Sequence, residues 1–503
     1  MTLDGESAVG RRVECDGHRG TVRYDGEIEG AGAGRWLGVE WDDPSRGKHD
    51  GVHQGRKYFD TKCALAGSFV RPHKVNLGRS CAEALLEQYE SSFEAQLTSF
   101  RTGSSGMVKT AEFVGFEKHL QKISNHNALR IVVLSNLCIR HGDRRLSELC
   151  PNVEELDLSK NLLSNVADVA SVVEHLPRLK TLLISHNLFS SWAGRKEVFD
   201  QIQNLVAASM ELTALDEIAD LFANLVTLKV PQNKICSLSQ LNFPLLRELD
   251  LDGNQIESWD AVQKLSALPN LQILHLNNNR IGSIPDLPSS VFPKLGTLYL
   301  SGNLLSDWRS VSALEFLPSL EELIFKDNPL LNAESPETNR QIIICRLARL
   351  KTLDKVSVSA SEKRGASFDY LKKYGKEYLA CRSNPQDLNL FYAKHPCYQK
   401  LVEVHGAPEE SELSGQKKNL LINVMIECPQ LKENGHVEKK LPRTMKLQRL
   451  RGMLPKLLPS APNMLKLSYI CRDKPEIKYE FDNDLKDLAF YSIQDNDSIV
   501  VEW

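Results

Sequence analysis

The residues with the clearest capacity for chemistry lie in one basic stretch near the N-terminus. From Arg46 to Arg79 the chain carries eight Lys or Arg residues against two acidic residues, whereas Met1 to Ser45 carries five basic and ten acidic residues. Phe59 and Phe69 interrupt the basic stretch. Cations interleaved with aromatic rings suit an acidic peptide that contains an aromatic residue. The alternative interpretation is a solvated basic surface.

Catalytic signatures are missing from the sequence. It contains no GxxxxGK[ST], HExxH or GxSxG motif and no Cys/His spacing typical of a metal site. The Gly/Ala alternation over Gly30 to Gly34 is followed by Arg35, and we interpret it as a loop between strands rather than as a dinucleotide site. We therefore predict a binding protein and no enzyme, with no catalytic residue, cofactor or metal site.

The composition is that of a soluble globular chain. Its 503 residues are 42% hydrophobic and 25% charged with a net charge of −3, so no global field favours nucleic acid or a membrane. No apolar run reaches the length of about 18 residues that a bilayer requires, and the acidic N-terminus predicts no signal peptide. The eleven cysteines form no CxxC pair, which favours free thiols in the cytoplasm.

The elements around the basic stretch predict a small all-β domain over residues 1–80. Short β-like runs alternate with glycine-rich turns, which is typical of a twisted sheet with tight connections. The order of residues resembles the cytoskeleton-associated glycine-rich (CAP-Gly) domain. The resemblance lies in Arg35-Trp-Leu-Gly-Val-Glu40, Gly47-Lys-His-Asp-Gly51, Gly55-Arg-Lys-Tyr-Phe59 and Gly67-Ser-Phe-Val-Arg71.

This resemblance implies binding of the acidic C-terminal tail of α-tubulin, which ends in an aromatic residue, and of similar tails. It implies that Lys48 meets the tail carboxylates and that Trp36, Phe59 and Phe69 line a groove for the terminal ring. Loop glycines permit the conformation of the binding loop. The implied binding residues are Trp36, Gly47, Lys48, His49, Asp50, Gly51, Arg56, Phe59 and Phe69.

One position departs from the CAP-Gly pattern. The family usually carries asparagine where this chain has His49. A neutral imidazole can donate one hydrogen bond but cannot reproduce the paired donor and acceptor set of an amide. We therefore expect tail binding to be weaker, or to depend on pH near the pKa of histidine.

The middle of the chain repeats the pattern Leu-x-Leu-x-x-Asn. Successive copies are 25, 26, 23, 23, 21, 25, 24 and 25 residues apart, within the range of about 20–29 for leucine-rich repeats. This spacing predicts an α/β solenoid over residues 129–330. The copies begin at Ile131, Leu156, Leu182, Leu205, Leu228, Leu249, Leu274, Leu298 and Leu323.

The repeated asparagine has a physical purpose. Its amide can pair backbone groups that a tight buried turn leaves without partners. The fourth copy has Met210 in this place, so we expect an irregular turn there. The strands between the turns would form an extended face for a partner. Candidate exposed strand positions are Asp157, Lys229, Asp250, His275 and Tyr299.

Helical segments flank the repeats on both sides. Residues 81–128 are predicted as a helical linker whose first helix docks at the open N-terminal end of the solenoid, followed by a flexible break at Thr102 to Gly106. Residues 331–400 are predicted to be a C-terminal repeat cap and a helical extension. Within them, Arg340 to Ala366 resembles the C-terminal cap of intracellular leucine-rich repeats, and the helical extension covers Phe368 to Tyr398. The apolar stripe of the linker helix contains Leu85, Leu86, Tyr89, Phe93 and Leu97.

A linker over residues 401–418 leads to a domain at residues 419–503 that resembles ubiquitin-like domains. The pattern predicts two strands, a helix over Lys446 to Leu458 interrupted near Pro455, and further strands, as in an α+β β-grasp fold. The chain ends at Trp503 without a diglycine tail, so we expect a recognition module rather than a modifier.

The three modules in this order resemble the tubulin-folding cofactor E family. The resemblance implies a cytoplasmic, cytoskeleton-associated chaperone that binds α-tubulin. It also implies action with the cofactors that carry β-tubulin and α-tubulin, in assembly and dissociation of the α/β-tubulin heterodimer. Two alternatives are an adaptor on the microtubule lattice and a ubiquitin-pathway adaptor that reaches the proteasome through the ubiquitin-like domain.

Overall fold

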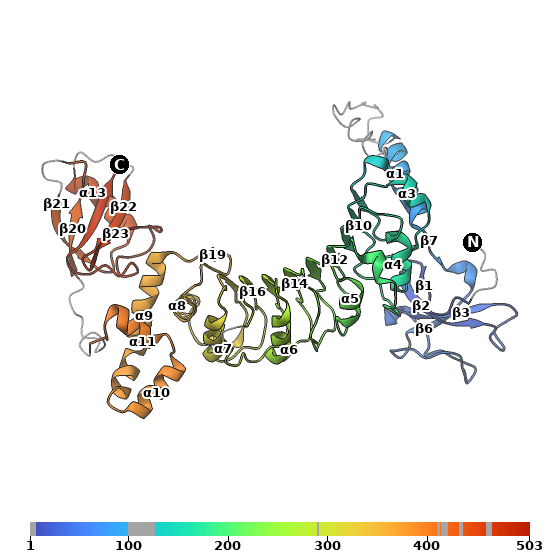
Figure 1. The fold of residues 1–503 in the computed structure, drawn as a ribbon, viewed down its shortest axis with the longest axis horizontal. Helices are drawn as coiled ribbons and strands as arrows, with labels where there is room; N and C mark the ends of the chain where they lie inside the picture. Colours follow the sequence, from blue (N-terminus) through green and yellow to red (C-terminus); the bar gives the residue numbers. More distant parts are fainter. Residues whose placement is uncertain are drawn as a thin grey trace, which may run out of the picture. The chain divides into compact units, whose positions relative to one another are not determined.

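A computed structural model describes residues 7–98, 126–288, 291–409, 413, 421–431, 436–458 and 465–503. Figure 1 shows the elements coloured in chain order. The chain forms two compact units, Met1–Arg280 with Phe292–Leu295, and Ile281–Val291 with Gly296–Trp503. None of the helices in the described ranges is both long and apolar enough to cross a membrane. The predicted break at Thr102 to Gly106 lies outside the described residues.

The N-terminal β domain is an antiparallel sheet in the order β1-β2-β3-β6. Val13, Val22, Leu37 and Val39 from the first three strands are fully buried in one core, which confirms the predicted small all-β domain. The strands are β1 (Arg12–Cys15), β2 (His18–Gly26), β3 (Trp36–Trp41) and β6 (Gly67–Val70), and a separate hairpin joins β4 (Val52–His53) to β5 (Arg56–Lys57).

Within the first unit, this β domain packs directly on the repeats. The buried N–H of Arg12 donates to Ser164 Oγ at 3.1 Å, and Lys62 Nζ lies 3.0 Å from Glu211 Oε2. Strand β7 (Arg79–Ser80) pairs in parallel with β9 (Ile139–His141). The β domain is therefore fixed to the repeat surface by backbone pairing as well as by side chains.

The linker helix α1 (Cys81–Thr98) follows β7 and packs beside α3 (Arg145–Leu149). Leu85 is fully buried, and the Tyr89 hydroxyl accepts a hydrogen bond from the N–H of Val133 at 3.2 Å. This confirms that the helix docks at the N-terminal end of the solenoid. The side chains of Phe93 and Leu97 lie outside the described part of the chain.

The repeats form parallel ladders of three-residue strands. The first unit has the order β8-β10-β11-β12-β13-β14-β15, and in the second unit β16-β17-β18 are parallel with β19 antiparallel. The middle residue of each three-residue strand of these ladders is almost fully buried, and it is a leucine, such as Leu156 or Leu182, in every one of them except β8, which explains the repeat pattern. The strands are β8 (Ile131–Val133), β10 (Glu155–Asp157), β11 (Thr181–Leu183), β12 (Asn204–Val206), β13 (Thr227–Lys229), β14 (Glu248–Asp250), β15 (Ile273–His275), β16 (Thr297–Tyr299), β17 (Glu322–Ile324), β18 (Thr352–Leu353) and β19 (Val356–Ser357). The helices between them are α4 (Val166–Val173), α5 (Asp216–Leu221), α6 (Trp259–Gln263) and α7 (Trp308–Ala313).

Buried asparagines connect successive repeats, as the sequence predicts. Asn161 Nδ2 donates to the carbonyls of Leu158 in its own turn and Leu134 in the preceding repeat, at 2.9 and 2.8 Å. Its Oδ1 accepts from the N–H groups of Leu137 and Ile139, each at 3.0 Å. With a longer bond from Nδ2 to the carbonyl of Ser159 at 3.4 Å, one amide thus pairs five backbone groups. Equivalent buried residues are Asn187, Asn233, Asn254, Asn279, Asn303 and Asn328.

The predicted register of the first repeat is wrong by one residue. Aligning Ile131 with Leu156 would place Asn136 at the turn, but β8 pairs Val132 with Leu156. Val132 is buried, Ile131 is 59% exposed, and Leu137 occupies the turn position. In the run Ile-Val-Val-Leu every residue is apolar, so alternation cannot show which side chains face the core.

The two turns that lack asparagine are irregular, which confirms the expectation at Met210. The residue after Met210 is Glu211, with φ of 61°, and the residue after Leu137 is Cys138, with φ of 56°. Both lie in the left-handed region, which is unfavourable for residues with a Cβ atom. The residue after each of the seven turn asparagines has a negative φ. The missing amide therefore changes the path of the backbone.

The C-terminal cap closes the repeats in the second unit. Arg340 Nε lies 2.6 Å from Glu362 Oε1, which joins α8 to α9 beside the last strands. The predicted helical extension divides into separate helices, and the last one continues into the segment predicted as a linker. The helices are α8 (Pro336–Arg346), α9 (Ala360–Cys381), α10 (Pro385–Lys394) and α11 (Tyr398–His405).

The C-terminal domain is a five-stranded β-grasp sheet with the order β21-β20-β24-β22-β23, in which β20 and β24 are parallel. The expected interruption near Pro455 is wrong, because the helix runs through it to Leu457. Leu450 and Leu454 are fully buried, and their packing holds the last turn despite the proline. The elements are β20 (Leu421–Glu427), β21 (His436–Pro442), α13 (Leu447–Leu457), β22 (Lys466–Cys471), β23 (Lys474–Glu480) and β24 (Asp497–Glu502).

All eleven cysteines are free thiols in the structure, as predicted from their spacing. Most are buried or half-buried, and Cys63 and Cys236 are exposed. Burial raises the pKa of the Cys150 thiol to about 12, which keeps it protonated and unreactive.

Replacing Asn233 with alanine should lower the free energy of unfolding by about 2–4 kcal/mol, because buried backbone groups lose their partners. The change is measured by urea denaturation followed by circular dichroism. The Asn233 amide pairs five backbone groups, which are the carbonyls of Ala207, Val230 and Pro231 and the N–H groups of Met210 and Leu212.

Asn224→Ala is the matched control for this prediction. Asn224 Nδ2 makes one exposed hydrogen bond, to the carbonyl of Asp200 at 2.9 Å. Its loss should change the free energy of unfolding by no more than about 0.5 kcal/mol. Equal losses in the two variants would show that the buried amide does not stabilise the repeats.

Candidate functional site

The candidate site is built on the loop from Gly47 to Gly51. Its backbone is held against β6, because the N–H groups of Lys48 and His49 donate to the carbonyl of Gly67 at 2.7 and 3.1 Å. In return the N–H of Gly67 donates to the carbonyl of His49 at 2.7 Å. The loop is therefore an extension of the sheet rather than a freely moving segment.

The two glycines that bound this loop are required by close backbone contacts. A Cβ atom at Gly47 would lie 1.9 Å from the carbonyl oxygen of Leu65. One at Gly51, which has φ of +94°, would lie 2.0 Å from the carbonyl oxygen of Phe59. Neither position can accept a side chain without moving the backbone. The sequence reasoning that assigned both glycines to loop conformation agrees with this geometry.

A cluster of rings lies beside the loop, with Phe69 at its centre. The ring of His49 stacks on Phe69 with centroids 4.6 Å apart, and Phe59 meets it edge-on at 5.4 Å. Tyr58 and His53 contact it edge-on at 5.6 and 6.2 Å. Phe59 is only 6% exposed, whereas Phe69 is half-buried. Phe69 and His49 therefore offer the accessible ring surface, and Phe59 supports them.

Trp36 does not belong to this cluster. Its half-buried ring lies under the guanidinium of Arg71, whose Cζ is 3.8 Å from the ring centroid. Among the ring pairs of the described residues, Trp36 forms none with Phe59 or Phe69. The three rings predicted to line one groove thus divide into a contacting pair and a separate cation-covered indole.

Most cations of the basic stretch are already neutralised. Lys48 is exposed, and its ammonium has no ion-pair partner among the described residues. Arg71 hydrogen-bonds to the carbonyl of Ala33 at 3.1 Å rather than to a carboxylate. The neutralised pairs are Arg46–Asp16, Arg56–Glu29, Lys57–Asp60, Lys62–Glu211 and Arg79–Glu87. The basic stretch therefore does not form a uniformly basic face, because only a few of its cations, such as Lys48 and Arg71, are not paired with a carboxylate in the described structure.

His49 takes over the acceptor function that an asparagine amide could supply. The N–H of Gly51 donates to His49 Nδ1 at 3.0 Å. The neutral ring must then carry its proton on Nε2, which has no hydrogen-bond partner among the described residues. Burial lowers the pKa of His49 below its ordinary value of 6.5, so the ring is neutral at about pH 7. Its Nε2–H remains a donor for an incoming carboxylate.

Sequence reasoning missed three residues that shape this site: Tyr58, His53 and Arg71. Tyr58 precedes Phe59 in the quoted motif, and its hydroxyl accepts from the N–H of Glu29 at 3.0 Å. Arg71 ends another quoted motif. The motif order could have included both residues, but nothing in the sequence places His53 against Phe69.

The separate modules match known domain families. The chain matches the CAP-Gly domain over residues 9–75, a leucine-rich repeat family over residues 246–381 and a ubiquitin-like domain over residues 421–502. With the fold described above, these matches define a multidomain protein that combines a CAP-Gly domain, leucine-rich repeats and a ubiquitin-like domain. Its N-terminal module is of the CAP-Gly class.

Relatives match along the whole chain. Tubulin-specific chaperone E of Danio rerio is 38% identical, covering 100% of this chain and 100% of its own length. The same-named proteins of Xenopus laevis and Homo sapiens are 35% and 34% identical, and each alignment covers 98% of both chains. The chain belongs to the tubulin-specific chaperone E family.

The stability of the β domain should fall as pH decreases through about 6.5, and His49 should contribute to this fall. Its folded pKa is depressed, so the unfolded chain takes up the proton first, and protonation also removes the Nδ1 acceptor of Gly51. The contribution is complete above the unfolded pKa and is lost below it. Histidine NMR should give a pKa below 6.5 and the Nε2–H tautomer.

The matched variant is His49→Asn, because an amide oxygen can accept from the same N–H without titrating. Its free energy of unfolding should therefore depend less on pH than that of the original protein. A dominant Nδ1–H tautomer at neutral pH, or identical pH profiles for the two proteins, would contradict this account of the loop.

Proposed function

We propose that this protein is a tubulin chaperone that binds α-tubulin and takes part in assembly and dissociation of the α/β-tubulin heterodimer. Support comes from the names of the full-length relatives and from the CAP-Gly match. The observation that carries the proposal is Lys48, which is exposed and has no ion-pair partner among the described residues, on a rigid loop beside the Phe69 cluster.

The tail of α-tubulin would be recognised by charge and ring together. Lys48 attracts its carboxylates, and the Nε2–H of His49 donates to one of them. The exposed Arg56–Glu29 ion pair is weak enough for Arg56 to exchange its partner. The half-buried rings of Phe69 and Trp36 offer apolar surface to an aromatic residue. Asp50 is exposed in the loop and would repel the carboxylates of the tail. This repulsion would orient the tail, because its acidic residues must lie away from Asp50.

The repeats would then engage the globular part of tubulin. The β domain is fixed to them by the Arg12–Ser164 hydrogen bond and by the β7–β9 pairing, so the tail is captured at a defined distance from the repeat surface. The cofactors that carry β-tubulin and α-tubulin act in the same reaction. The ubiquitin-like domain supplies a further contact, to tubulin, to a cofactor or to the proteasome. Any nucleotide hydrolysis belongs to tubulin, and the protein works in the cytoplasm and on the cytoskeleton.

Replacing Lys48 with glutamate should weaken binding to the α/β-tubulin dimer by about tenfold or more, because an attractive contact becomes repulsive. The affinity is measured with the full chain and native tubulin by biolayer interferometry at fixed salt. Tubulin from which the acidic tails have been removed should bind the original protein and the variant equally.

Lys74→Glu is the matched control, since Lys74 is also exposed, lies in the same domain and stands outside the loop. It carries the same change of charge and should bind tubulin as the original protein does. Unchanged binding of the Lys48 variant would overturn tail capture. Binding only to polymerised tubulin, with the soluble dimer left intact, would support the lattice adaptor instead.

A further inference from the structure

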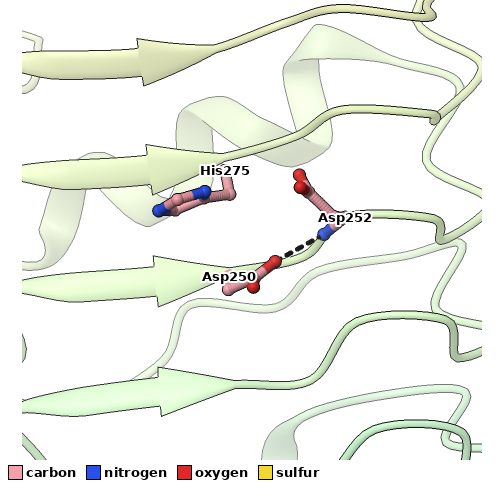
Figure 2. Close-up of side chains that lie close together, drawn as sticks. All are labelled: Asp250, Asp252 and His275. Carbon is pink, nitrogen blue, oxygen red and sulfur yellow. Dashed lines mark hydrogen bonds between the residues drawn. The ribbon is translucent and has the colours of Figure 1, made fainter.

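Two aspartates and a histidine meet on the repeat sheet of the first unit. Asp250 ends β14 and is paired with His275, which ends β15, and Asp252 follows two residues after Asp250 on the same side. One potential ligand atom from each of the three side chains lies within 4.8 Å of the others. Figure 2 shows them gathered over the ends of neighbouring strands.

The repeat architecture creates this cluster once. The two aspartates occupy two equivalent positions of the repeat, namely the last residue of the strand and the residue two positions later, at the start of the turn. Asp157 is followed in this way by Ser159, and Lys229 by Pro231. Only Asp250 is followed by a second acid, and the neighbouring strand is the one that ends in histidine.

Surrounding hydrogen bonds hold the three side chains in place. Asn277 donates to both carboxylate oxygens of Asp252, from its backbone N–H at 2.7 Å and from Nδ2 at 2.9 Å. Asp250 Oδ1 accepts from the N–H of Asp252 at 2.9 Å, the bond drawn in Figure 2. These bonds fix the directions of the carboxylates before any ligand arrives.

Glu248 lies beside the histidine, and its Oε1 is 3.5 Å from His275 Nε2. A histidine that faces a carboxylate through one nitrogen is the usual arrangement at metal sites, where the carboxylate orients the ring.

The charges of the cluster do not balance. Glu248, Asp250 and Asp252 are acidic, and among the described residues the ammonium ion-paired with this group is that of Lys229, 2.9 Å from Glu248 Oε1. Three carboxyl groups thus face one ammonium. A divalent cation would restore neutrality and remove the repulsion between the aspartates.

We propose that Asp250, Asp252 and His275 form a binding site for a divalent transition-metal ion such as Zn²⁺. One imidazole nitrogen with two carboxylate oxygens suits zinc, whereas Mg²⁺ and Ca²⁺ require more oxygen ligands. Three protein ligands leave a coordination position for water or for a side chain of a bound protein. The site is independent of the proposed function, because the metal can be measured without tubulin.

The sequence predicted no metal site, because these ligands do not stand at the short, regular spacing of a metal-binding motif. Here His275 follows the aspartates by 25 and 23 residues, which is one repeat of the solenoid. Only the pairing of β14 with β15 brings the ligands together. When the ligands come from two adjacent repeats, they do not form a recognisable motif in any short stretch of the sequence.

The test measures Zn²⁺ binding to the chelator-treated full chain by isothermal titration calorimetry, after the thiols have been alkylated to remove cysteine sites. The original protein should bind one more Zn²⁺ ion than the variant D250N/D252N/H275Q, and should bind Zn²⁺ at least tenfold more tightly than Mg²⁺. Co²⁺ substitution should give a visible absorption spectrum typical of nitrogen and oxygen ligands, which the variant lacks.

Asp157→Asn provides the matched control, since Asp157 occupies the same strand-end position as Asp250 in another repeat. It should leave the stoichiometry unchanged. If the triple variant unfolds by circular dichroism, the single variant H275Q serves in its place and should weaken Zn²⁺ binding at least tenfold. Equal Zn²⁺ stoichiometry and affinity in the original protein and the folded variant would overturn the proposal, as would equal affinity for Mg²⁺.

Discussion

The burial of backbone polar groups in tight turns is the constraint on which the rest of this structure depends. Each repeat turns sharply inside the protein and leaves N–H and carbonyl groups without partners within their own segment. The asparagine amide pairs both kinds of group, because it donates to a carbonyl of its own turn and accepts from an N–H of the preceding repeat. Since each amide joins two repeats, the loss of one turn exposes unpaired groups in its neighbour. This makes the solenoid cooperative over adjacent repeats.

The N-terminal site obeys the same constraint by other means. Its loop runs so close to the backbone of Leu65 and Phe59 that only glycine fits at Gly47 and Gly51. Backbone groups of the loop pair with Gly67 at the start of β6. His49 adds a side-chain acceptor for Gly51 and a ring for Phe69. The loop therefore holds Lys48 in a preformed position, so the ordering cost of the proposed binding to a flexible partner would be small.

Much of this could be predicted from the sequence because period and spacing are properties of the chain itself. The leucine spacing identified the solenoid, and the interruption at Met210 correctly marked an irregular turn. Prediction failed where all residues of a segment are of the same type, or where contacts between residues far apart in the sequence decide the structure. The all-apolar run at Ile131 hid its register, and Pro455 looked like a break although buried leucines hold the helix around it. At the candidate site, order along the chain showed the glycines and Lys48. Ion pairs such as Lys62–Glu211 join residues 149 positions apart, so no count of charges could show which cations remain available.

The two turns without asparagine have a consequence for how the domains depend on each other. Arg19 hydrogen-bonds to Asn136 and Arg79 to the carbonyl of Leu137 at the first turn, while Lys62 pairs with Glu211 at the other. The N-terminal domain and the segment that follows it therefore contact both turns of the described repeats that lack the buried amide. A chain without this domain would lose these contacts, and its first repeats would be less stable.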